Sequence, residues 1–187
     1  MSLSPREMER LASGLKTIVG ADFRVNEEGT EIAFPKTTQD QYMVLTSFCG
    51  RPDGTNLVAL AEVGGAFKFK AADQTQDALH EIEFQAERTM QRIANLQAAA
   101  PNLKELTGLD FTYDANNRML TTSVGMAAIT PEPILALHGQ GALDYTLALN
   151  PGDSLLCIKD VNPDVLRNVV ETRAKFSANR TGGQGKV

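Results

Sequence analysis

The sequence contains no tryptophan, only two cysteines and two histidines, and 6% aromatic residues. So few aromatic side chains argue against a stacking platform for carbohydrates or nucleobases. A net charge of −5 argues against nucleic acid binding through a broadly basic face. No apolar run approaches the roughly 18 residues that a membrane span requires. The first residues also lack the basic and apolar regions of a secretory signal. We therefore expect a cytoplasmic chain with no nucleic acid partner and no membrane span.

The histidines and cysteines do not have the spacing of a metal site or of a known catalytic motif. Cys49 and Cys157 lie in apolar surroundings, so we expect buried free thiols. His80 falls inside a long helical pattern, where we expect a solvent-facing or lightly buried residue and not a catalytic base. His138 precedes a glycine, and a pairing with Cys157 would make a thiol-dependent enzyme conceivable. We predict no cofactor, no metal and no catalytic residue, with this thiol pair as the enzymatic alternative.

The start of the chain predicts a capped amphipathic helix. Ser4 and Glu7 have the spacing of a capping box, and Pro5 occupies the first helical position. Apolar residues then recur at helical spacing until Gly20, which ends the helix. A turn at 27–29 leads into an expected strand at 30–34.

The middle of the chain predicts strands followed by the longest helix. Residues 41–48, 56–63 and 66–70 are rich in strand-forming side chains, and 51–54 form a turn sequence. A capping signal at Asp73 then begins a helix that we expect to end at about Ala100, before Pro101. Its apolar surface is broad enough to touch more than one neighbour, so the helix packs on its own sheet or also forms a homodimer contact.

The last third predicts a hairpin, a short helix and a strand–helix unit. Residues 109–113 and 118–124 flank an Asp/Asn-rich turn. Residues 134–149 fit either one helix or a helix, loop and strand, and the pattern does not decide between them. A strand at 154–158 and a helix capped at Asn162 follow. We see no internal repeat.

These elements predict an α+β fold, with an antiparallel sheet flanked by an N-terminal helix, a long central helix and a C-terminal helix. We expect one domain with a core over 1–150, a strand–helix extension of that domain over 151–180, and a flexible tail over 181–187.

The order of these elements resembles the small acidic chaperones that escort effectors to type III secretion systems. The resemblance lies in residues 11–20 and 26–32, the strand–turn–strand from 42 to 60, the long helix from Asp73, and the hairpin at 116–117. It covers about four-fifths of the chain and consists of hydrophobic patterns. The chain also continues beyond the length of such chaperones, with the extra strand–helix unit after Asn150.

The resemblance implies homodimerisation, no cofactor, and capture of an extended segment of a client polypeptide by strand addition or groove binding. The residues placed by it at a dimer contact are Leu79, Ile82, Ala86, Met90 and Ile93. The residues placed by it on a sheet surface, whose two faces are not assigned to core or partner, are Ile32, Phe34, Leu45, Leu57 and Leu60.

The sequence therefore favours a non-catalytic protein-binding chaperone or adaptor. The alternative is a structural or assembly subunit of a phage or secretion apparatus, in which the terminal helix and glycine-rich tail contact neighbouring copies. A small thiol-dependent enzyme is the third hypothesis.

Overall fold

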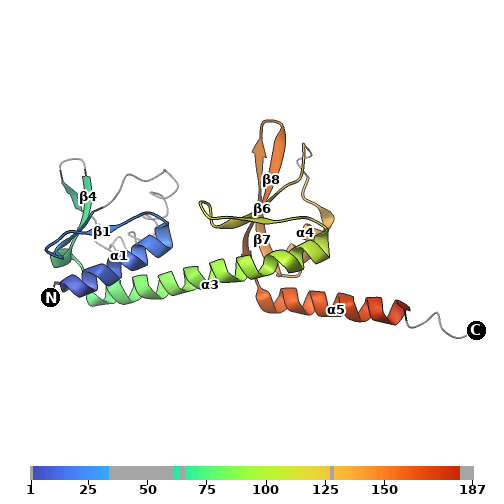
Figure 1. The fold of residues 1–187 in the computed structure, drawn as a ribbon, viewed down its shortest axis with the longest axis horizontal. Coiled ribbons are helices and arrows are strands. Elements are labelled where there is room, and N and C mark those ends of the chain that lie inside the picture. The colour runs from blue at the N-terminus through green and yellow to red at the C-terminus, as the bar shows by residue number, and fades with distance from the viewer. Residues whose placement is uncertain (1, 34–60, 64–65, 127–128, 182–187) are drawn as a thin grey trace, which may run out of the picture. The chain divides into compact units, whose positions relative to one another are not determined.

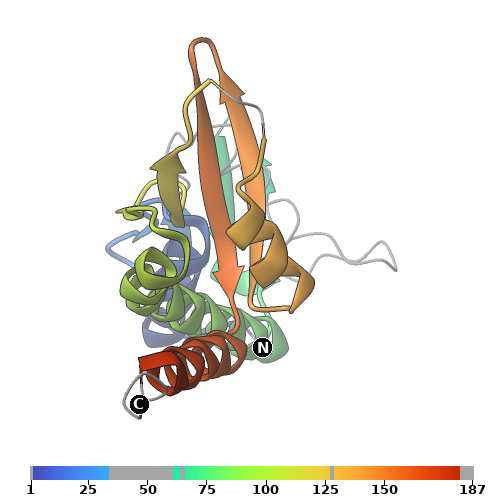
Figure 2. The same ribbon diagram turned by 90° about the vertical axis from the view of Figure 1, so that its right-hand side faces the viewer.

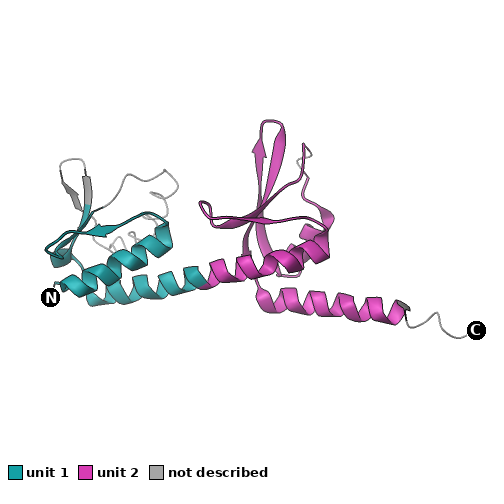
Figure 3. Cartoon of the chain, in the orientation of Figure 1, with its two compact units in different colours: residues 1–90 teal, residues 91–187 magenta. Residues whose placement is uncertain are grey.

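The computed structural model describes residues 2–33, 61–63, 66–126 and 129–181 (Figure 1). The chain divides into two compact units, residues 1–90 and 91–187 (Figure 3). The predicted α+β class is confirmed, since helices pack on antiparallel sheets. The expected core over 1–150 and extension over 151–180 differ from this division, because position 150 lies inside a strand hairpin of the second unit.

The first unit is a four-stranded antiparallel sheet in the order β1-β2-β4-β3, with helical elements before and after it. Residues 41–48, which were expected to form a strand, lie outside the described residues. The predicted strand at 66–70 is confirmed. The elements of the first unit are α1 (Pro5–Val19), β1 (Arg24–Val25), β2 (Glu31–Ala33), β3 (Ala61–Val63), β4 (Ala66–Lys70), the 3-10 turn η1 (Ala71–Asp73) and the first part of α3 (Gln76–Thr107).

Helix α1 begins and ends as its sequence predicts. The Glu7 carboxylate accepts hydrogen bonds from the Ser4 backbone N–H and from the Ser4 hydroxyl, both at 2.7 Å. At the other end Gly20 adopts a left-handed backbone with φ 82°, and its N–H donates to the Lys16 carbonyl. Glycine adopts this conformation without steric cost, which makes it a common terminator of helices.

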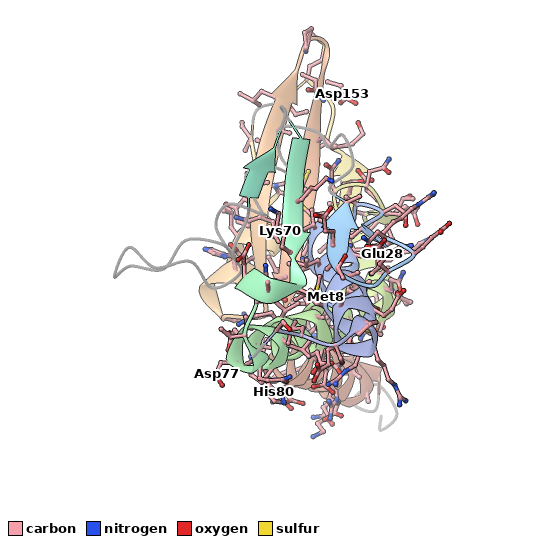
Figure 4. The ribbon with its side chains drawn as sticks, turned by 90° about the vertical axis from the view of Figure 1, so that its left-hand side faces the viewer. Met8, Glu28, Lys70, Asp77, His80 and Asp153 are labelled. Atoms are coloured by element: carbon pink, nitrogen blue, oxygen red, sulfur yellow. The ribbon has the colours of Figure 1, made fainter. Side chains whose placement is uncertain are left out.

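The core of the first unit lies between α1, the start of α3 and the sheet. Met8, Leu15, Ile32, Phe69 and Leu79 have 0% exposed surface in this core. Figure 4 shows Met8 pointing inward from α1, while His80 points away from α3, in agreement with its predicted exposure.

Helix α3 begins later and ends later than predicted. Thr75, and not Asp73, caps it, because the Thr75 hydroxyl accepts the Ala78 N–H at 3.1 Å. The helix then continues through Pro101 to Thr107. A proline inside a helix costs about 3 kcal/mol. Burial of Leu96 and Leu103, on either side of it, offsets that cost, since both are fully buried in the second unit.

The second unit is a four-stranded antiparallel sheet in the order β5-β6-β8-β7. For residues 134–149 the structure has the helix, loop and strand: α4 ends at Gly139 and β7 begins at Leu143. The hairpin around 116–117 is confirmed, and its positive φ of 55° falls on Arg118. The elements after α3 are β5 (Thr112–Asp114), β6 (Met119–Ser123), α4 (Glu132–Gly139), β7 (Leu143–Asn150), β8 (Asp153–Val161) and α5 (Pro163–Thr181).

The two units repeat one arrangement, which corrects the expectation that the chain has no internal repeat. Each unit has a helix, two strands, a connection, two strands and a helix, and its sheet has the order first, second, fourth, third. The second part of α3 is the first helix of the second unit. The segments LKTIVGADF (15–23) and LKELTGLDF (103–111) align without a gap.

The repeat extends to hydrogen bonds and register. Lys16 pairs with Asp22 at 3.1 Å, and the equivalent Lys104 pairs with Asp110 at 2.6 Å. Gly108 repeats the left-handed termination seen at Gly20. The strand pairing is also the same, since the partners of β1 and β2 and those of β5 and β6 occupy equivalent positions.

Gly14 allows α1 to approach α3 closely. A Cβ atom built on Gly14 would lie 2.6 Å from the Cγ2 atom of Ile82, a buried and stiff side chain. We expect Gly14→Ala to lower the free energy of unfolding by about 1–3 kcal/mol through overpacking. Gly139→Ala in α4 is the matched control, because no atom lies within 4 Å of the added methyl group. Urea unfolding should show the loss in the first variant alone; equal stability of the two would contradict the close approach.

The capping box makes the stability of the first unit depend on pH. Hydrogen bonds from the Ser4 backbone, the Gln76 side chain and the Ser4 hydroxyl lower the pKa of Glu7 from 4.5 to about 2. A lowered folded-state pKa adds stability above the unfolded value and loses it as pH falls. The stability difference between the native protein and Glu7→Ala should therefore be full above about pH 5 and shrink toward pH 2. A difference that is constant from pH 7 to pH 2 in urea titrations would contradict this account.

Candidate polypeptide-binding surface

Helix α5 is fixed at its start and along one side. The Asn162 side-chain oxygen accepts hydrogen bonds from the N–H groups of Asp164 and Val165, as the predicted cap requires. Leu166 is 2% exposed and enters the core of the second unit. Farther along, the Arg173 guanidinium donates to the carbonyl oxygens of Glu105 and Leu106 at the end of α3. These contacts hold α5 against α3 within this unit.

An open groove lies along α5 and overlaps its anchored side, since Arg173 also lines it. The groove has a volume of about 580 Å³ and runs along the helix beside Gln140. Val165, Val169 and Phe176 supply its apolar wall, at spacings that place them on one face of the helix. The two valines also pack on the core, whereas Phe176 is 69% exposed. Phe176 therefore extends the apolar wall of the groove to a side chain that its own chain leaves largely uncovered.

The rim of this groove is polar, and the helix is basic. Asn168 and Thr172 lie along it. Helix α5 carries four basic and two acidic side chains, in a protein whose net charge is −5. Among the residues that line the groove, Arg173 is the charged one, and the positive charge of α5 otherwise lies elsewhere on the helix.

Other large apolar side chains of the second unit are also exposed. Leu149 in β7 is 66% exposed, and Met126 and Ile129, in the segment after β6, are 83% and 73% exposed. Backbone hydrogen bonds join Val124 and Gly125 to Ser154, so that segment continues the pairing of β6 toward the tip of the β7–β8 hairpin. Figure 4 places Asp153 at this end of the hairpin.

The residues predicted for a dimer contact do not form one surface. Leu79 and Ile82 have 0% exposed surface and Ala86 has 8%, all within the core of the first unit. Such side chains are already covered by their own chain and offer a second copy nothing to contact. Ile93 is half-buried and Met90 is 62% exposed. Of the predicted set, Met90 alone presents most of its surface to solvent.

Most of the predicted partner surface falls outside the described residues. Ile32 is fully buried in the first core, opposite Phe69 in the strand pairing. The remaining residues of that prediction, Phe34, Leu45, Leu57 and Leu60, lie outside the described residues.

Cys157 and His138 lie on opposite faces of the second sheet. The His138 ring packs edge-on against Tyr145 with centroids 5.2 Å apart, and Nδ1 lies 3.1 Å from the Leu143 carbonyl oxygen. Tyr145 pairs with Ile158, whereas Cys157 pairs with Thr146. Successive strand residues point to opposite faces, so the thiol faces away from the histidine. The structure does not assemble the thiol–histidine pair.

The described part of the chain contains no cluster of three or more His, Cys, Asp or Glu side chains able to hold a metal ion. None of its helices has the length and the run of apolar residues that a bilayer crossing requires.

With this geometry established, the chain was compared with known proteins. It matches no protein-family model, no curated protein and no solved structure.

The groove on α5 was not predicted, although its residues were visible in the sequence. They belong to an apolar stripe at helical spacing, which consists of Val165, Leu166, Val169, Val170 and Phe176. This stripe is wider than a single buried helix face requires. Its width was the feature of the sequence that could have indicated a second contact surface on the helix. In the structure Leu166 is buried in the core of the second unit, whereas the Phe176 side chain is exposed to solvent.

The thiol hypothesis has a direct test. Burial raises the pKa of the Cys157 thiol, with a further contribution from the Asp114 carboxylate, so little thiolate forms at neutral pH. In a Cys49→Ala variant, where Cys157 is the only cysteine, iodoacetamide should label the protein at pH 7 only after denaturation. Mass spectrometry measures the modified fraction. Rapid labelling of the native protein would contradict the buried, inert thiol.

Proposed function

We propose that this protein is a non-catalytic chaperone or adaptor that holds an apolar segment of another polypeptide in the α5 groove. The observation that carries this proposal is the exposed Phe176 beside an apolar groove on a well-anchored helix. Burying a phenylalanine contributes about 1.5–3 kcal/mol to binding. Recognition of a segment in a groove on a helix is a common mode of peptide binding.

The charge of α5 indicates what kind of segment it holds. A basic helix favours a segment in which acidic side chains flank the apolar ones. This complementarity also predicts that binding weakens as salt concentration rises, because salt screens exposed charge pairs. The resemblance to secretion chaperones supports the more specific role of an escort for a secreted client.

The test compares two aspartate substitutions that lie two residues apart on α5, on opposite sides of the helix. Phe176→Asp places a charge in the groove, whereas Ala174→Asp, also exposed, places the same charge outside it. The full-length protein should retain a specific polypeptide from its native lysate, identified by mass spectrometry. Calorimetry with that polypeptide should show binding at least tenfold weaker for Phe176→Asp and unchanged for Ala174→Asp, since apolar anchors dominate such interfaces.

Equal weakening by both aspartates, or no retained polypeptide, would contradict the adaptor function.

The second candidate function is a structural or assembly subunit. The position of the groove on α5 supports this candidate too, because that helix could contact a neighbouring copy. A truncation after Ser177 separates the two candidates. The truncation keeps every residue of the groove. The adaptor keeps its client, whereas an assembly subunit that uses the end of the chain loses its neighbours.

A further inference from the structure

Within the part of the chain that the structure describes, strand β7 is an edge strand that is paired on one side only. It is the last strand of the second sheet, and all its ladder partners belong to β8 (Figure 2). Near its start, the Leu143 carbonyl faces His138, and the Tyr145 N–H donates to the Asp144 side chain. For 146–150, the described residues form no hydrogen bond along the outer side. Its backbone groups there are available to a further strand.

The free part of β7 lacks the features that usually protect an edge. Natural edge strands are commonly short, bulged, or marked by lysine or proline. β7 is eight residues long, its one irregularity lies at Asp144/Tyr145, and its only charged side chain is Asp144. An edge of this kind is suited to pairing with another strand.

The sequence of β7 is complementary to itself. When two copies run antiparallel with Leu147 opposite Leu147, Thr146 meets Ala148, and Tyr145 meets Leu149. Asp144 then meets Asn150, so no like charges oppose each other. Directly opposed residues share a face, so Tyr145 of one copy would cover Leu149 of the other. This pairing accounts for the 66% exposure of Leu149 in a single chain.

We propose that two copies of this protein form a dimer by antiparallel pairing of their β7 strands about a twofold axis at Leu147. The two sheets become one continuous sheet, and each copy presents the same edge to the other. This interface replaces the α3 contact predicted from sequence, whose central side chains are buried. It is separate from the α5 groove and does not depend on the proposed function.

Charge exchange at the interface tests the pairing. Thr146 is exposed and Ala148 is half-buried, and both lie on the face opposite the core of the unit. Thr146→Lys/Ala148→Lys and Thr146→Glu/Ala148→Glu each place two like-charge pairs across the twofold axis. Each variant alone should dimerise at least tenfold more weakly than the native protein in sedimentation equilibrium. An equimolar mixture should restore the dimer, because every lysine then faces a glutamate.

Ala94→Lys/Ala98→Lys is the control, since both residues are exposed on α3. It should dimerise as the native protein does, apart from the small effect of added charge. Hydrogen exchange on the native protein gives a second measurement: alternate amides of 145–150 should become protected as concentration rises through the dimerisation range. A native monomer at all concentrations, like-charge variants that still dimerise, or a mixture that stays monomeric would overturn the proposal.

Discussion

The burial of apolar side chains in both halves of α3 is the constraint on which both units depend. Leu79 and Ile82 complete the first core, and Leu96 and Leu103 complete the second. Neither unit has a full set of helices without its part of α3, because each sheet needs a helix before it and a helix after it. A break in this helix would therefore remove a wall from two cores at once, which explains why the helix continues through Pro101.

Much of the local structure could be predicted from residues that act over short distances. The capping box at Ser4, the termination at Gly20, the hairpin near Asn116 and the cap at Asn162 are local signals, and the structure contains all four. The end of α3 could not be predicted in the same way. Proline is a strong local signal for a break, and only the tertiary burial of residues beyond it reverses that preference.

The candidate surface was less accessible to prediction, because exposure depends on what the rest of the fold leaves uncovered. The apolar stripe of α5 indicated contact but not which part of it reaches the core. The predicted dimer residues show the same limit, since Leu79 and Ile82 are apolar enough for an interface but lie in a core. The repeat was visible in the sequence, because 15–23 and 103–111 both begin with Leu-Lys and end with Gly-x-Asp-Phe. Recognising it would have shown that the end of α3 corresponds to the end of α1, and that α3 therefore belongs to both units.

Comparison of the equivalent helices shows where the second unit departs from the first. Thr75 and Asn162 cap equivalent positions, so Ala78, Ile82 and Ala86 in α3 correspond to Val165, Val169 and Arg173 in α5. The first set is 1%, 0% and 8% exposed. In the second set the valines are half-buried and the arginine is exposed. One fold therefore leaves this face covered in the first unit and open in the second. Residues that only stabilise the fold have no reason to differ in this way, so the open face of α5 is the part of the repeat that is free to take on a binding role.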